Sequence, residues 1–380
     1  MHNITLETGR DGLLNTQTGE QYVAAEYTVG RVGNWTSAGS QQRKDNATVE
    51  ATLEAAVRGA FLADAASLSF QGLYDADRMH KLLHRTDGKS LSPEFHRPLD
   101  IEYKAARGSF SAYAYEVLPL MHTLLSNNHL EPEQFRNDSL AFLRGFRGHS
   151  SPLMREFASK AGRGLKGADA AGPSDHAHSL VKVPLVVARY AGDAELADRL
   201  AAVIAVHQTN EDATLAGIVF SAILERMGLL GATLQEAAEW VAGEGSLLES
   251  GRRWVREVLQ QRDMGSVEGV QHFGRGPKAV SVLQSSLHLA LTAGSYVEGV
   301  RNNILAGGDT TSRAHVVGAL LAAQHGDSSL PKRWMKKATK FMDVKQMVHV
   351  IIVQRTQFVP FFINRDPRQQ PDAPRNVTFV

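Results

Sequence analysis

Apolar residues recur every three or four positions over most of the chain, which is the spacing of amphipathic helices. The first such segment starts near Ala47 and carries Leu53, Val57, Phe61 and Leu68 on one face. Shorter helices are expected up to about residue 160. Longer ones are predicted at about 111–126, 179–190, 194–207, 211–228, 233–243, 247–262, 277–293, 296–306, 310–325 and 331–341. Strands do not alternate with these helices, so the pattern predicts a compact all-α fold rather than a parallel sheet.

The two ends of the chain depart from the helical pattern. Residues 1–46 are rich in Gly, Thr, Asn and Gln and predict an irregular or β-containing N-terminal arm. Packing on the body, contacts within a homo-oligomer and disorder all remain open for this arm. The last thirty residues, beginning VIIVQRT, predict an extended and then Pro-rich segment. The expected division is the arm at 1–46, a helical domain at 47–341 and a C-terminal extension at 342–380.

Composition excludes several classes of function. The chain has 41 Lys and Arg against 40 Asp and Glu, so no basic excess points to nucleic acid or to an anionic membrane as a partner. It has no cysteine, which excludes disulfides, thiolate nucleophiles and Cys-based metal sites. The N-terminus lacks the pattern of a secretory signal, and the most apolar windows, LAGIVFSAIL and VVGALLAA, are shorter than a membrane span. We therefore expect a cytoplasmic protein.

Two polar groups interrupt apolar helix faces, where burial costs free energy unless a partner or ligand satisfies them. Asp64 shares the face of Val57 and Phe61, so it either hydrogen-bonds another element or faces a polar cavity. His207 lies at the end of the apolar face of the helix predicted at 194–207, and the run HQTNED begins with it. In that run Asn210 is predicted as a helix N-cap, followed by Asp212 in the first turn. A plain polar turn with a satisfied histidine is the structural alternative.

The third interruption is the run GGDTTSR at 307–313. Gly307 and Gly308 can adopt the left-handed conformation that ends a helix, and Asp309 can cap the next one. Arg313 then falls on the buried face of that helix, beside Val316 and Val317. An acid and a base at this position need a ligand or each other, and a local salt bridge is the structural alternative.

Other signals are weaker. GRGLKG at 162–167 fits G-x-G-x-x-G, but no strand precedes it, so a dinucleotide fold is rejected. His80 and His84, like His176 and His178, are close in sequence without an evident third ligand, so we interpret them as surface or loop histidines.

Five segments in order resemble motifs of the ADP-ribosylglycohydrolase family, in the branch that includes the jellyfish J-type crystallins. They are GAFLADA at 59–65, LYD at 73–75, SDHAHSLVK at 174–182, VHQTNED at 206–212, and GGDTTSRA at 307–314 with Gly318-Ala319 and Pro331-x-x-Trp334. The resemblance covers about residues 47–340. It implies a compact, orthogonally packed multi-helix fold with a central cleft. In active members two magnesium ions in this cleft position the ribose while the bond to a protein side chain is hydrolysed.

The metal-binding motifs of the family are incomplete in this chain. Where the family has T-D-D-T, the sequence is GSFSAYAYE at 108–116, which keeps only the carboxylate of Glu116. In the last motif Asp309 and Thr310 remain, but Thr311 replaces the second aspartate. A binuclear site for a hard cation needs several carboxylates. No cofactor is therefore certain, and magnesium stays a candidate with Asp309 as its ligand. Arg313 is expected to supply positive charge in place of the metal.

These observations leave three hypotheses. The first is a hydrolase of a glycosidic bond in an ADP-ribose-like or nucleoside-like ligand, in which Asp309 orients the ribose hydroxyls or a water. Asp64 or Asp212 would then be the acid or base, and Arg313 would neutralise an anionic group. Further ligand-binding candidates are His207, Asn210, Glu116, Tyr74, Asp75, Asp175, Gly307, Gly308 and Thr310. The second is a non-catalytic crystallin-like or ligand-binding relative, and the third is an enzyme repurposed for another reaction in the same cleft. The expected partner is a small nucleotide-like or sugar-like molecule.

Overall fold

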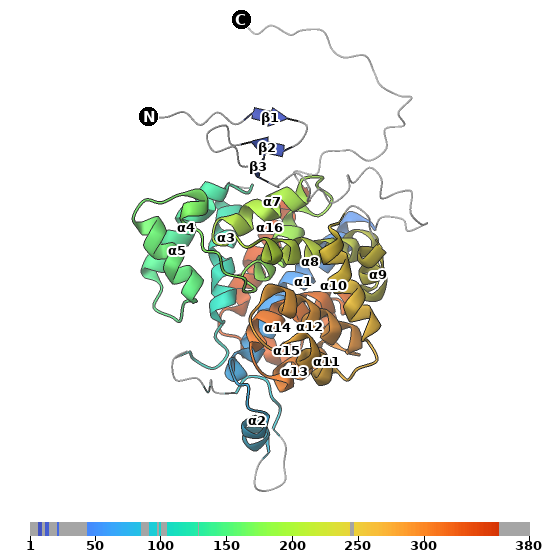
Figure 1. Ribbon diagram of the computed structural model, residues 1–380. Helices are drawn as coiled ribbons and strands as arrows, with labels where there is room; N and C mark the ends of the chain where they lie inside the picture. Colours follow the sequence, from blue (N-terminus) through green and yellow to red (C-terminus); the bar gives the residue numbers. More distant parts are fainter. Residues whose placement is uncertain are drawn as a thin grey trace, which may run out of the picture.

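The computed structural model describes residues 44–84, 91–96, 99, 105–127, 129–243 and 247–356, together with the backbone of 7–9, 12–14 and 21–22. Within this part the protein is built almost entirely of helices (Figure 1). In chain order they are α1 (Asn46–Ser67), α2 (Ala76–Leu83), α3 (Ala112–Asn127), α4 (Pro132–Gly145), α5 (Pro152–Gly162), α6 (Val183–Tyr190), α7 (Leu196–Ala205), α8 (Glu211–Leu230), α9 (Leu234–Gly243), α10 (Glu249–Gln260), α11 (Ser266–Phe273), α12 (Ala279–Thr292), α13 (Tyr296–Ala306), α14 (Thr310–His325), α15 (Lys332–Met335) and α16 (Phe341–Thr356). The predicted all-α fold is confirmed.

Three short strands are described in the N-terminal arm. They are β1 (Glu7–Gly9), β2 (Gly12–Leu14) and β3 (Gln21–Tyr22), and they form one antiparallel sheet in the order β1-β2-β3. Glu7 pairs with Leu14, and Leu14 pairs with Gln21. The other residues of the arm up to residue 43, and residues 357–380 of the expected C-terminal extension, lie outside the described residues.

Helices α1 and α14 form the centre of the body (Figure 1). From Ala55 to Ser67 every residue of α1 is buried, so this part of the helix is covered on all sides rather than along one stripe. The two helices approach closely at glycines, because a Cβ at Gly59 would lie 2.4 Å from the carbonyl oxygen of Gly318. The remaining helices surround this pair, and α2 projects from the body in Figure 1.

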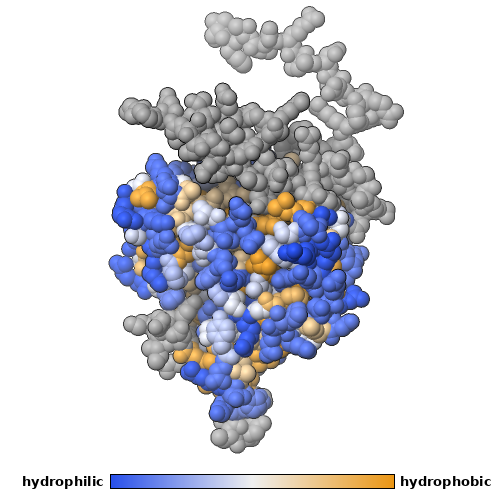
Figure 2. Space-filling model, viewed as in Figure 1, coloured by the Kyte–Doolittle hydropathy of each residue, from blue (hydrophilic) through white to orange (hydrophobic). Residues whose placement is uncertain are grey.

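Helix α8 is the one described helix that is long and apolar enough to cross a membrane, and 89% of its apolar window is buried inside the protein. It is therefore packed as a core helix. Its ends follow the sequence signals, since Asn210 caps its N-terminus and Gly231 ends it in the left-handed conformation (φ 64°). On the face shown in Figure 2, hydrophilic side chains dominate and apolar ones form small separate groups.

The C-terminal part of the chain corrects one expectation. Residues 350–356 were predicted to be extended, but they belong to α16. This helix buries Phe341, Val344, Val348 and Ile351 at helical spacing and packs against α1, α3 and α6. The helix predicted at 331–341 is also too long. Only α15 forms there, because the chain then turns so that Thr339 N donates to Gly108 O (2.9 Å).

Candidate functional site

Short backbone bridges bring the motif segments together. Leu73 pairs with Gly308, Gly172 with Gln208, and His176 with Lys278. Asp309 N also donates to the carbonyl oxygen of Arg275 (2.8 Å). Four of the segments singled out in the sequence (73–75, 174–182, 206–212 and 307–314) therefore meet each other or the loop between α11 and α12.

Two glycines allow the tight contact between the loop before α14 and the loop before α2. Gly307 and Gly308 have φ values of 69° and 74°, which an L side chain rarely adopts. A Cβ at Gly307 would lie 2.6 Å from the carbonyl oxygen of Leu73, and one at Gly308 would lie 2.3 Å from that of Arg275. Both glycines are therefore required by the backbone, and no contact with a ligand is needed to explain them.

Asp309 lies at the centre of the site, and each of its carboxylate oxygens accepts a hydrogen bond from a protein side chain. It is the N-cap residue of α14, although its side chain makes no capping bond. Gln71 Nε2 donates to Oδ1 (2.6 Å) and the hydroxyl of Tyr113 donates to Oδ2 (2.9 Å). The Gln71 amide is oriented from its other end, where Oε1 accepts from Thr311 N (2.8 Å) and Thr311 Oγ1 (2.9 Å). Thr310 also belongs to this group through a bond from its hydroxyl to Ser67 O (3.2 Å).

A second group of buried charges surrounds Glu116 on α3. Its Oε1 accepts from Ser151 Oγ (2.9 Å), and its Oε2 lies 2.8 Å from His178 Nδ1 and 4.0 Å from Lys182 Nζ. Burial alone would raise the pKa of Glu116, but His178, Lys182 and Ser151 hold it below the usual value. Burial lowers the pKa of Lys182 to about 8, opposed by the Glu116 carboxylate. Glu116 is therefore held by protein partners rather than placed beside Asp309 as a metal ligand.

The ring of His178 packs on that of Tyr113, with centroids 5.0 Å apart. Tyr113 therefore links the Asp309 group to the Glu116 group. Sequence reasoning did not select Gln71, Tyr113, His178 or Lys182 as site residues. The available signal was the aromatic and neutral composition of the segment that replaces the aspartates, together with a lysine in an otherwise apolar helix start.

A cavity of about 440 Å³ opens beside these groups. It is lined by Pro152, Leu153, Glu156, Pro173, Ser174, Asp175, His176 and Asn210. The ring of His176 lies 3.8 Å from the Asp175 carboxylate. Burial and the neighbouring His178 lower the pKa of His176 below its usual value, against the opposing effect of Asp175 and Asp309. The Asp175 carboxylate pairs with Lys278 Nζ (3.0 Å), and this contact lowers the pKa of Asp175.

The structure does not place the proposed acid/base residues at this cavity. Asp64 is completely buried, where it accepts hydrogen bonds from the backbone N–H (2.8 Å) and the hydroxyl of Ser111 and lies 3.5 Å from His315 Nε2. Asp212 is exposed in the first turn of α8, and it does not line the cavity. Neither position suits a group that must reach a substrate beside Asp309.

The guanidinium of Arg313 is also held by hydrogen bonds within the protein. Its Nε donates to Asn303 Oδ1 (2.9 Å), and its terminal nitrogens donate to the carbonyl oxygens of Asn303 (3.3 Å), Gly307 and Arg275 (3.2 Å). The side chain is fully buried, and this burial lowers the pKa of Arg313 to about 10, opposed by Asp309. The expectation that it binds an anionic ligand is therefore replaced by a structural role, in which it fixes the two loops that contact Asp309.

The other predicted ligand-binding residues have varied environments. His207 is buried between Phe135 and Phe157, and neither of its ring nitrogens has a hydrogen-bond partner among the described residues. Burial, with Lys182 and His178 nearby, holds the pKa of His207 well below its usual value. Asp75 caps α2 through Arg78 N (2.9 Å). Tyr74 is 48% exposed, and Arg275 lies over its ring at 5.7 Å.

The described residues do not fit a binuclear magnesium site. No group of three or more His, Asp or Glu side chains that could hold a metal occurs among them. Both oxygens of Asp309 already accept a hydrogen bond, and a hard cation there would gain only one carboxylate, whereas a binuclear site needs several. No step through magnesium follows from this arrangement.

Comparison with known proteins agrees with the motifs and the helical fold. Residues 45–359 match the ADP-ribosylglycohydrolase family, a span that includes α16. The chain belongs to this family. It is similar to crystallin J1B of Tripedalia cystophora, with 25% identity over 82% of this chain and 98% of the relative. Crystallin J1A of the same animal is 25% identical over 81% and 96%.

The structural comparison gives the same fold. An ADP-ribosylglycohydrolase-related protein matches with a TM-score of 0.57 and 15% identity, covering 81% of this chain and 99% of the other. At this identity the likeness concerns the fold, and any activity has to be argued from the site.

Proposed function

We propose that this family member does not perform magnesium-assisted hydrolysis. Its role is instead structural, as a stable protein of the crystallin type. The observation that carries the proposal is that each carboxylate oxygen of Asp309 accepts a hydrogen bond from a protein side chain, Gln71 or Tyr113. The similarity to two crystallins along nearly their full lengths supports it. The buried carboxylates of Asp309 and Glu116 are both held by side chains of the protein.

The proposal is tested by hydrolysis. The purified chain is incubated with a peptide carrying ADP-ribose on an arginine or serine side chain, with and without magnesium, and release of ADP-ribose is followed by chromatography. The proposal predicts no release above the protein-free background in either condition. Magnesium-dependent release that Asp309→Asn abolishes and Asp212→Asn preserves would overturn it.

A second candidate is metal-independent cleavage of a glycosidic bond in a nucleoside-like or ADP-ribose-like ligand. The cavity of about 440 Å³ beside Asp175, His176 and Asn210 favours it, because this space could take a small ligand. The lowered pKa of His176 leaves the ring neutral near pH 7, as a general base requires. Release of ADP-ribose without magnesium that His176→Ala abolishes would favour this candidate over the first.

A further inference from the structure

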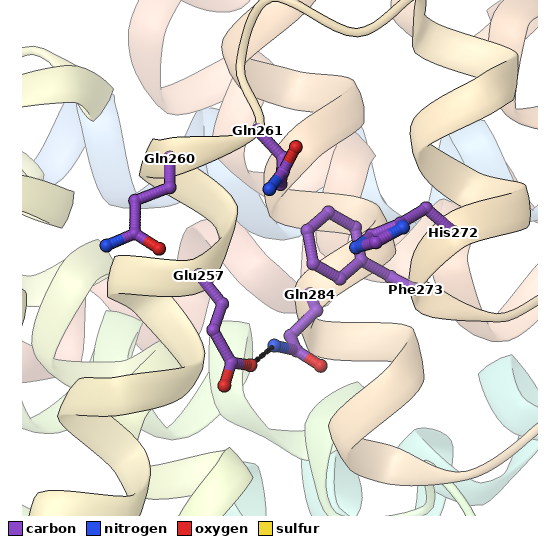
Figure 3. Close-up of a pocket in the computed structure, with 6 residues that line it drawn as sticks. All are labelled: Glu257, Gln260, Gln261, His272, Phe273 and Gln284. Atoms are coloured by element: carbon purple, nitrogen blue, oxygen red, sulfur yellow. Dashed lines mark hydrogen bonds between the residues drawn. The ribbon is translucent and has the colours of Figure 1, made fainter.

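A second cavity lies away from the cleft, between the C-terminal halves of α10 and α11 and the middle of α12 (Figure 3). Its volume is about 280 Å³. The lining side chains are Glu257, Gln260, Gln261, His272, Phe273 and Gln284. Five of the six are polar. In Figure 3 Gln261, His272 and Phe273 face a common space, Glu257 and Gln284 turn toward each other beside it, and Gln260 lies at its outer edge. None of these residues belongs to the motifs of the cleft.

Gln284 is the best-defined group in this cavity. Gln284 is only 8% exposed. Its Nε2 donates to Trp254 O (3.2 Å) and to Glu257 Oε2 (2.8 Å). Both of these neighbours are acceptors, so this end of the amide must be the nitrogen. The amide oxygen is therefore the opposite end, and no hydrogen bond to it is found among the described residues. Because Gln284 lines the cavity, this oxygen is free to accept a hydrogen bond from a molecule bound there.

The charge of the cavity argues against an anion. Glu257 is the one lining residue with a negative side chain, and the lining contains neither lysine nor arginine. Arg253 lies outside the lining, where its Nε is 3.7 Å from Glu257 Oε1 in an exposed ion pair. A phosphate or carboxylate would thus face a carboxylate and an amide oxygen with little compensation.

The remaining groups match a ligand with many hydroxyls. Gln260 and Gln261 each offer a donor and an acceptor, as a sugar hydroxyl does, and Glu257 accepts hydrogen bonds. Phe273 supplies an apolar surface, with His272 packed against it at 4.8 Å between ring centroids. A flat nucleobase could stack on this ring, but its edge has fewer hydrogen-bonding groups than the five polar side chains present. The volume falls just below the range of pockets for drug-sized ligands, so it suits one ring.

We propose that this cavity binds a neutral monosaccharide unit, whose hydroxyls bond to Gln284, Gln260, Gln261 and Glu257 while its C–H face packs on Phe273. A partly open site of this size with one buried contact should bind weakly, with a Kd of about 1 mM. The site shares no lining residue with the cavity beside Asp175 and His176, so it does not depend on whether the cleft is catalytic.

The proposal is tested by saturation-transfer NMR on the full chain with glucose, galactose, mannose and N-acetylglucosamine, each offered separately. Adenosine and inorganic phosphate are the comparison ligands. We expect transfer to at least one sugar, and more than tenfold weaker binding after Gln284→Leu. Gln260→Ala, on the exposed rim, should weaken binding severalfold without changing the melting temperature. Gln235→Ala, on the surface of α9 and outside the cavity, should leave binding unchanged.

Each other outcome overturns the proposal. No transfer to any of the four sugars would remove it, as would sugar binding that Gln284→Leu and Gln260→Ala leave intact. Binding of adenosine in preference to the sugars would assign the cavity to a nucleobase, and binding of phosphate would contradict the charge argument.

Discussion

Replacing Arg313 with methionine removes a buried guanidinium while keeping much of the side-chain volume. The change deletes four hydrogen bonds, to Asn303 Oδ1 and to the carbonyl oxygens of Asn303, Gly307 and Arg275. The Arg275 carbonyl keeps its bond from Asp309 N, so three acceptors lose the Arg313 donor. Each acceptor left unpaired costs about 1–3 kcal/mol, and relief from burying the charge offsets part of the sum. We expect a net loss of about 3–5 kcal/mol in the free energy of unfolding, the lower half of that sum.

Thermal unfolding followed by circular dichroism measures this loss. For a chain of this size about 1 kcal/mol changes the melting temperature by roughly 1–2 °C, so Arg313→Met should melt about 3–10 °C below the wild type. The matched control is Arg275→Met, because the Arg275 side chain is partly exposed and makes one bond, to Tyr74 O (3.1 Å). Its loss should stay below about 1 kcal/mol. Equal melting temperatures for the two variants would refute the structural role of Arg313.

Three further predictions concern pH, the Asp309 carboxylate and helix packing. Because the pKa of His207 is depressed in the folded state, the unfolded state binds the proton first as the pH falls. Below pH 6.5 the free energy of unfolding of the wild type should therefore fall by about 1.4 kcal/mol per pH unit relative to that of His207→Leu. Thermal melts at pH 5–7 measure this difference, and parallel pH curves for the two proteins would contradict it. Tyr113→Phe removes a bond to Asp309 and should destabilise by about 1.5–3 kcal/mol in denaturant titrations, whereas an unchanged midpoint would show that the bond is absent. Gly318→Ala should cost about 1–3 kcal/mol through overpacking, while Gly145→Ala, with open space around it, should be nearly neutral; similar losses in both would disprove the close crossing.

Much of the fold could be predicted because the hydrophobic spacing is strong in the central helices. Helices α8, α13 and α14 agree with the predicted ranges to within about two residues. Helix α16 was missed because VIIV consists of β-branched residues, which are typical of strands. Burial of Val348, Ile351 and Ile352 against the body outweighs that local preference. Helix α11 is short and was also missed.

The site was harder to predict because it depends on contacts between distant segments. The sequence indicated that Asp309 and Arg313 lie together at the start of a buried helix, and the structure agrees. It could not show that Gln71 and Tyr113, 238 and 196 residues away from Asp309, satisfy its carboxylate. Nor could it show that the carboxylate of Asp64 accepts a hydrogen bond from Ser111 N. A buried acid has the same sequence pattern whether its partner is a ligand or a protein group.

The central claim is that hydrogen bonds from protein side chains hold the carboxylate of Asp309 and that it binds no metal ion. Isothermal titration of the purified chain with magnesium and with ADP-ribose, separately and together, tests it most directly. The claim predicts no heat of magnesium binding, and no effect of magnesium on any ADP-ribose binding. Magnesium-dependent binding of ADP-ribose that Asp309→Ala abolishes would contradict it.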